Sequence, residues 1–183
     1  MMGVGAAESG DVPSDVVDAL LSDWRAERPD LDVQAMAVVG RIIMISQKLH
    51  QRVGTVLSEF DLNYSDFDVL ATLRRSGEPY ELTPTELMRS VLITSGAMTA
   101  LLDRLTARGF IQRGQNRRDG RVRTAILTAE GRALVDRAAQ VRFAEASQAA
   151  ACFSSGEQAE MSVALKRLNR WLDELADADR RVE

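Results

Sequence analysis

The sequence predicts a mainly α-helical protein, in which a winged helix-turn-helix lobe is flanked by N- and C-terminal helices that form a dimerisation domain. Apolar residues recur at three- and four-residue spacing through most of the 183 residues, which is typical of amphipathic helices. Two short helices joined by a tight turn, and then two strand-like runs, occupy the middle of the chain. Between residues 99 and 128, seven arginines against two aspartates give a charge of +5 in a chain of net charge -4. Because the guanidinium fork suits phosphates, this block predicts a confined polyanion-binding face.

Composition limits the chemistry that the chain can perform. At 45% hydrophobic and 27% charged residues, it is an ordinary globular chain. Cys152 is its only cysteine and His50 its only histidine, so we expect no disulfide, no metal site and no cofactor. The same scarcity, without a glycine-rich phosphate loop, argues against an enzyme. Charges interrupt the apolar runs, so we expect neither a membrane span nor a signal peptide, and a cytoplasmic location.

The N-terminal part is predicted to contain two helices. Residues 1–10 are expected to be disordered, and residues 11–60 to form two amphipathic helices. The first ends before Pro29. Asp32 can cap the second, whose apolar stripe reaches Phe60. This part is expected to supply one half of the dimerisation domain.

Residues 61–127 are predicted to form the winged helix-turn-helix lobe. Ser65 or Asp66 can cap a short helix that ends near Gly77, and one short strand can follow it. The next helix begins at the sequence TPTEL, where a threonine cap, a proline and a glutamate three residues after the cap mark a strong helix start. A further helix ends at Gly109, which suits the left-handed position after a helix.

This further helix and the strand-like runs after it carry the residues that DNA recognition needs. Small and hydroxyl side chains on its early turns let the backbone approach the major groove: Thr94, Ser95, Gly96, Ala97 and Thr99. The strands, at about residues 110–113 and 122–127, enclose a polar loop. Its arginines would reach phosphates or the minor groove, and they are Arg117, Arg118 and Arg121. The lobe is therefore predicted to bind double-stranded DNA.

Residues 128–183 are predicted to complete the dimerisation domain. Thr128 caps one helix, and Ser154 with Glu157, or Ser155 with Gln158, offers a capping box for the last. The last helix carries an apolar seam at heptad-like spacing: Met161, Leu165, Leu168, Leu172 and Leu175. Because such a seam is too apolar for water, we expect an obligate homodimer on a pseudo-palindromic DNA site, and we expect Leu168→Asp to unfold it.

The run of residues 67–134 resembles the MarR family of winged-helix regulators. The resemblance lies in TPTEL, TSGAMT, DRL, RGFI and LTAEGRAL, and in the wing sequence NRRDGR. It implies that Asp119 orients Arg121 toward the minor groove. Arg104 and Arg123 complete the predicted set of DNA-binding residues. The resemblance further implies a sequence-specific transcriptional regulator, most simply a repressor, that responds to a small ligand.

The segment DWRAERPD, residues 23–30, resembles the urate-responsive, PecS-like branch of this family. That resemblance implies a ligand pocket that contains Trp24, Asp68 and Arg113. Leu101 stands where the branch has an arginine, so we expect a small aromatic or carboxylate ligand other than urate. Leu101→Arg is then expected to restore part of a urate response. The alternative is that Trp24 only packs in a core.

Two further functions remain open beside this one. Cys152 is predicted to be a buried structural thiol, and the alternative is a redox-sensing regulator that acts through it. The chain could also be a helical dimerisation protein that binds no DNA. The arginine block argues against that reading, and a titration with nonspecific duplex would separate the two.

Overall fold

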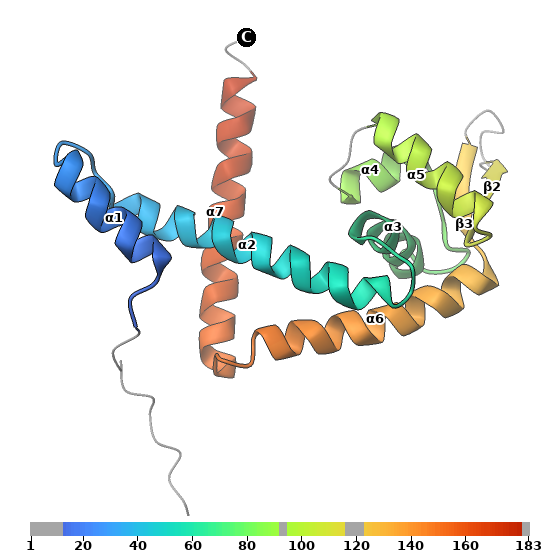
Figure 1. Cartoon of the computed structure of the whole chain (residues 1–183). Helices are drawn as coiled ribbons and strands as arrows, with labels where there is room; N and C mark the ends of the chain where they lie inside the picture. Colours follow the sequence, from blue (N-terminus) through green and yellow to red (C-terminus); the bar gives the residue numbers. More distant parts are fainter. Residues whose placement is uncertain (1–12, 92–94, 116–122, 181–183) are drawn as a thin grey trace, which may run out of the picture. The chain divides into compact units, whose positions relative to one another are not determined.

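The computed structural model describes residues 13–91, 95–115 and 123–180 (Figure 1). The chain divides into two compact units, residues 1–51 and 52–183. The bounds of the helices and strands are α1 Val16–Glu27, α2 Gln34–Ser58, α3 Tyr64–Arg75, β1 Glu81–Leu82, α4 Pro84–Ser90, α5 Ser95–Ala107, β2 Ile111–Gln115, β3 Arg123–Leu127, α6 Ala129–Ala149 and α7 Ser155–Asp179. The predicted mainly helical, winged-helix fold is confirmed.

The first unit contains α1 and the greater part of α2. Asp15 caps α1 through a capping box with Asp18. The predicted cap of α2 is confirmed, because an Asp32 carboxylate oxygen accepts a hydrogen bond of 2.9 Å from the Gln34 N–H. A small core forms around Val17 and Leu21.

Arg41 of α2 ties α1 to α2. Its guanidinium donates to Asp15 at 2.9 and 3.0 Å and to Asp18 at 2.6 Å. These bonds favour the ionised carboxylates, and they hold the pKa of both aspartates below the usual range. The attachment of α1 therefore has a charged as well as an apolar component.

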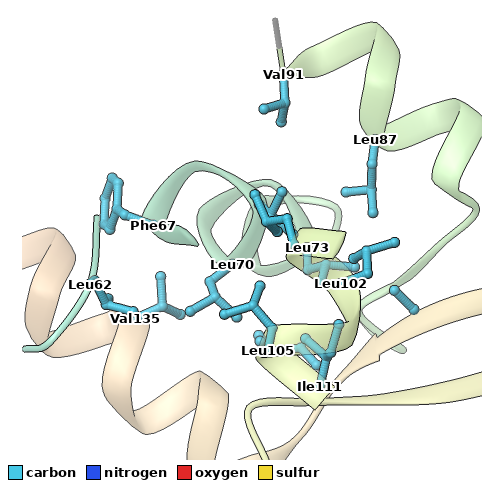
Figure 2. Close-up of a cluster of buried hydrophobic side chains, with 14 of the residues drawn as sticks. Leu62, Phe67, Leu70, Leu73, Leu87, Val91, Leu102, Leu105, Ile111 and Val135 are labelled. Carbon is cyan, nitrogen blue, oxygen red and sulfur yellow. The ribbon is translucent and has the colours of Figure 1, made fainter. Parts of the chain in front are cut away.

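The second unit contains the three-stranded sheet and the helices around it. The strands are antiparallel in the order β1-β3-β2. We call the part of this unit that precedes α7, residues 52–149, the central lobe. Its apolar core draws side chains from α3, α4, α5, β2 and α6, and Figure 2 shows them converging. Leu70, Leu73 and Leu105 are fully buried there.

Most predicted helix ends of the central lobe and α7 are confirmed. Capping boxes start α4 at Thr83 and α7 at Ser154, and Thr128 caps α6. Gly109 follows α5 with a φ of 75°, in the left-handed region. The predicted cap of α3 is wrong: Asn63 caps it, and Asp66 is the third helical residue.

A glycine at position 131 permits a close approach between α6 and the chain before β2. A Cβ atom at Gly131 would lie 2.0 Å from the Phe110 carbonyl oxygen. Thr128 holds the same junction, because its hydroxyl donates to the carbonyls of Gly109 and Phe110 at 2.8 and 3.1 Å. The TAEG sequence thus joins α6 to the end of α5.

Helix α7 has a different environment from the lobe helices. None of its described residues is buried, and apolar side chains of its seam are exposed: Met161, Leu165, Leu172 and Leu175. Within the described residues, no helix is long and apolar enough to cross a membrane.

The attachment of α1 should depend on Arg41 and on pH. Because the pKa of Asp15 and Asp18 is lowered in the folded chain, their contribution is present above the usual aspartate pKa of about 4 and is lost as the pH falls below it. Arg41→Ala should release α1 already at neutral pH. The measurement is Trp24 fluorescence in a Trp171→Phe background, since Trp24 lies on α1.

Arg28→Ala is the control for this prediction. It removes an exposed ion pair, between Arg28 and Asp30, that lies outside the helices. Equal emission spectra for Arg41→Ala and Arg28→Ala from pH 3 to pH 7 would contradict a role for Arg41.

Candidate nucleic-acid interface and ligand cavity

Helices α4 and α5 form the predicted helix-turn-helix, and α5 has two distinct faces. Met98, Leu102 and Leu105 of α5 are buried in the lobe core. On the early turns, Gly96, Ala97, Thr99 and Ala100 are exposed. Because these exposed side chains are small, the helix backbone can approach another molecule closely.

Apart from Arg104, the predicted DNA-binding residues fall into two sets. Gly96, Ala97 and Thr99 lie on the exposed turns of α5, and the exposed Arg123 begins β3. Thr94, Arg117, Arg118, Asp119 and Arg121 lie outside the described residues, as does the side chain of Ser95. The contacts of all these residues with DNA stay a prediction.

Strands β2 and β3 form the predicted hairpin. Their register pairs Ile111 with Leu127 at one end and Gln115 with Arg123 at the other. Arg123 therefore stands at the end of the hairpin where the predicted wing loop begins. It forms no ion pair within the part of the chain that the structure describes.

Three arginines of the basic block are held by other parts of the lobe. Arg104 Nη2 lies 2.6 Å from Asp66 Oδ1, and Asp66 is buried. Arg108 donates to the Asp61 carbonyl at 2.7 Å and lies over the Phe110 ring, 4.8 Å from its centre. These two arginines join α5 to the N-terminal end of α3.

The third of these arginines is Arg113, a predicted ligand-binding residue. Arg113 Nη2 lies 2.5 Å from Asp103 Oδ1, which joins β2 to α5. Asp68, the second such residue, lies on α3 and lines a cavity whose lining does not include Arg113. Arg113 is therefore not part of this cavity, and its grouping with Asp68 in one ligand site stays a prediction.

The cavity at Asp68 lies between α3 and α6 and has a volume of about 530 Å³. Its lining combines aromatic, apolar and charged residues: Tyr64, Phe67, Asp68, Ala71, Arg74, Arg75, Val135, Ala139, Arg142, Phe143 and Ala146. Burial raises the pKa of Asp68, and the charge of Arg75 partly opposes that rise. A carboxyl with a raised pKa keeps its proton up to a higher pH, and the protonated form can donate a hydrogen bond.

The three arginines of this cavity differ in their partners. Arg74 Nε lies 2.7 Å from Asp136, and Arg142 Nη1 lies 3.0 Å from Glu145. Arg75 donates to the Thr72 hydroxyl at 2.8 Å and forms no ion pair with a residue that the structure describes. Of the three, Arg75 therefore has the charge most open to an anion.

Trp24, the third predicted ligand residue, belongs to the first unit. It is 52% exposed and lines a second cavity, of about 580 Å³, with apolar residues of α1, α2 and the turn between them. In the described chain it is therefore not a core residue. The structure describes the two units separately, so the grouping of Trp24 with Asp68 and Arg113 stays a prediction.

Leu101 lies in the core rather than in a pocket. It is 3% exposed and belongs to the same cluster as Met98 and Leu102. An arginine there would bury an unpaired charge, which is strongly destabilising. We therefore replace the expectation that Leu101→Arg restores a urate response with the opposite one, a loss of lobe stability.

The two rare side chains have ordinary environments. Cys152 is exposed, between α6 and α7, so the prediction of a buried thiol is wrong. The His50 ring nitrogen Nδ1 lies 2.8 Å from the Ser46 carbonyl oxygen in the preceding turn. Among the described residues, no group of three or more His, Cys, Asp or Glu side chains could hold a metal ion.

Sequence reasoning missed two residues of these sites. Tyr64, Asp68, Ala71 and Arg75 are spaced by four, three and four, so they share one face of α3, and this spacing could have revealed Arg75. Asp66 was assigned only as a possible cap. Its partner, Arg104, is 38 residues away, and no local pattern indicates that pair.

Comparisons with known proteins agree with this architecture. The sequence profile of the MarR family matches residues 60–122. The chain is 33% identical over 156 residues to the HTH-type transcriptional regulator PecS of Dickeya dadantii, covering 85% of this chain and 94% of PecS. It is 35% identical over 103 residues to the multiple antibiotic resistance protein MarR of Salmonella typhimurium, covering 56% and 69%. A crystal structure of a mutant MarR from E. coli complexed with operator DNA matches with a TM-score of 0.65 and 28% identity, covering 74% of this chain and 96% of that chain.

Proposed function

The chain belongs to the MarR family of winged-helix transcriptional regulators, and we propose that it is a homodimeric repressor that releases a pseudo-palindromic operator on binding a small aromatic or carboxylate ligand. The observation that carries the DNA-binding part is the two-faced helix α5. Its apolar face is fixed in the lobe core, while Gly96, Ala97 and Thr99 are exposed. The related MarR structure with operator DNA supports the same role for this chain.

In the proposed complex, α5 enters the major groove and the wing reaches the adjacent minor groove. Thr94, Ser95, Gly96, Ala97 and Thr99 then face base edges and phosphates. Arg117, Arg118, Arg121 and Arg123 bind phosphates or the minor groove, with Asp119 orienting Arg121. The arginines bring positive charge to the phosphates, so affinity should fall as salt rises.

Arg121→Ala should weaken operator binding by about 1 to 3 kcal/mol if the arginine enters the minor groove. If it only contacts a phosphate, the slope of log affinity against log salt should fall by about one. The measurement is a titration with an operator selected from a random duplex library, at several salt concentrations. Arg137→Ala, an exposed arginine on α6, is the control for loss of one charge. Equal affinities for both variants at every salt concentration would remove Arg121 from the interface.

The proposed homodimer is supported by exposed apolar side chains in both units. On α2 they are Val38, Val39, Ile43, Ile45 and Leu49, and on α7 Met161, Leu165, Leu172 and Leu175. Rows of this kind are costly in water, and a second copy of the chain would cover them. A two-fold dimer would also match two half-sites about one DNA turn apart.

Leu168→Asp should break the dimer and leave the central lobe folded. Described residues of α7 are not buried, whereas the lobe core comes from other elements, so this outcome replaces the unfolding expected from the sequence. Light scattering should give a monomer mass at micromolar concentration, and circular dichroism should keep a cooperative melting transition. Asn169→Asp adds the same charge at a neighbouring exposed position and should remain dimeric. If the Leu168→Asp protein remained a dimer, the apolar seam of α7 would not be the dimer interface.

The proposed ligand site is the cavity at Asp68. Tyr64, Phe67 and Phe143 offer aromatic walls, and Arg75 offers a cation to a carboxylate. Burial raises the pKa of Asp68, and a ligand carboxylate beside it would favour the protonated form further, which can donate a hydrogen bond. This chemistry favours an aromatic monocarboxylate over urate.

Benzoate should raise the melting temperature of the wild-type protein and loosen it from the operator, and Arg75→Gln should lose both effects. Phenol and urate are the comparison ligands: we expect a smaller shift with phenol, which lacks the carboxylate, and little response to urate. Arg137→Gln is the control for loss of a lobe arginine. An undiminished benzoate shift in Arg75→Gln would show that the ligand binds elsewhere.

A further inference from the structure

We infer that Asp66 is a positioning residue for DNA recognition: its buried carboxylate holds Arg104 and so sets the direction of α5, and Arg104 acts through Asp66 rather than by contacting DNA. This inference rests on the proposed function, in which α5 enters the major groove. It assigns to Arg104 a different role from the DNA contact predicted from the sequence.

The Asp66 carboxylate occupies a fixed place in the lobe. The residue is 2% exposed and lies in the first turn of α3, a helix in which Phe67, Val69 and Leu70 are also buried. Its Oδ2 atom accepts from the N–H of Asn63, the cap of the same helix, at 3.4 Å. Because the surrounding backbone is helical and packed, the carboxylate cannot follow a moving partner without disturbing α3.

Arg104 satisfies this buried charge from α5. Asp66 Oδ1 accepts from Nη2 of Arg104 at 2.6 Å and from Nε at 3.2 Å. The Arg104 side chain is 44% exposed, so the aspartate loses more hydration in this pair than the arginine does. A buried carboxylate that lost its partner would be strongly destabilised, and this cost keeps Arg104 on Asp66.

The anchor lies at the opposite end of α5 from the exposed small residues. Eight residues separate Gly96 from Arg104, which corresponds to about 12 Å along a helix axis. A tilt of about 10° at the anchor would therefore move the first turn by about 2 Å, which is enough to lose hydrogen bonds to base edges. Contacts with the flexible, uniformly charged phosphate backbone tolerate such a shift better, because they carry no sequence information.

Arg108 strengthens the same end of the helix. Its Nη1 atom lies 4.0 Å from Asp66 Oδ2, and it donates to the Asp61 carbonyl in the turn before α3. Arg104 of α5 and Arg108, which directly follows the last residue of α5, thus converge on the N-terminal end of α3. Their charges are engaged within the lobe, so they are not the arginines that bind phosphate.

The positioning role and a direct phosphate contact predict different results for Arg104→Gln. A lost phosphate contact lowers affinity for every duplex to a similar extent and reduces the salt slope by about one. A lost anchor lowers affinity for the operator, leaves nonspecific affinity near that of the charge control, and leaves the salt slope unchanged. Arg137→Gln supplies the charge control.

The experiment compares Arg104→Gln, Asp66→Asn and the double variant on a selected operator and on a nonspecific duplex. We expect operator affinity to fall about tenfold or more in each single variant, as loss of a hydrogen bond between charged groups suggests. The double variant should bind no more weakly than the weaker single variant, because both changes remove the same interaction. Glu59→Gln removes an exposed carboxylate and should match the wild type. Asn63→Ala removes the cap and should lower the melting temperature without this loss of operator affinity.

Amide hydrogen exchange gives a readout that does not need DNA. In Arg104→Gln, whose substitution site is half exposed, amides of α5 should exchange faster while those of α6 keep the wild-type rate. Unchanged exchange in α5, unchanged operator affinity, or a uniform loss on both duplexes with a reduced salt slope would each overturn the inference. A wild-type protein that binds no duplex would overturn the proposed function and this inference together, whereas failure of the inference alone leaves wild-type binding intact.

Discussion

The burial of one face of α5 is the constraint on which the functional surfaces of the lobe depend. A helix of this length in a small lobe can stay folded only if its apolar stripe is covered, and Met98, Leu102 and Leu105 meet this need. The opposite face is thereby turned outward with its small residues. The same burial takes Leu101 into the core, so an arginine at this position could not reach a ligand while it remained packed there. Under the proposed function, this one packing requirement separates the DNA-binding surface from the ligand site.

The arginine block is less uniform in the structure than in the sequence. Arg104, Arg108 and Arg113 are each paired with or bonded to an acidic residue of the lobe, and they stiffen the links of α5 to α3 and to β2. Because these three arginines are paired within the lobe, they have less charge to offer to phosphates. Under the proposed function, most of the phosphate-binding charge then falls on Arg123 and on the arginines of the loop between β2 and β3.

The features that could be predicted from the sequence depend mainly on residues close together in the chain. The capping boxes at Thr83 and Ser154 depend on residues three positions apart, and the helical stripes repeat within one or two turns, so each was found without knowledge of the fold. Asp66 shows where this reasoning ends. A capping pattern predicted only a role at the helix start, whereas its main partner is on another helix. The burial predicted for Cys152 was wrong for a similar reason. Its alanine-rich surroundings in the sequence indicate burial, whereas the turn between α6 and α7 exposes it.

In the cavity between α3 and α6, the cost of leaving a charged side chain without its partner determines which arginine can bind a ligand, and it favours Arg75. Glu145 is buried and has both carboxylate oxygens engaged, one by Arg142 and the other by Arg52 at 2.8 Å. Moving Arg142 to a ligand would leave a buried carboxylate with one partner, which costs more than an exposed ion pair returns. Arg74 is likewise engaged, with Asp136 and with the Tyr80 ring, 5.3 Å from its centre. Arg75 has only a hydrogen bond to the Thr72 hydroxyl and an attraction to the Asp68 carboxyl in the same cavity, so a carboxylate entering this cavity meets the least resistance there.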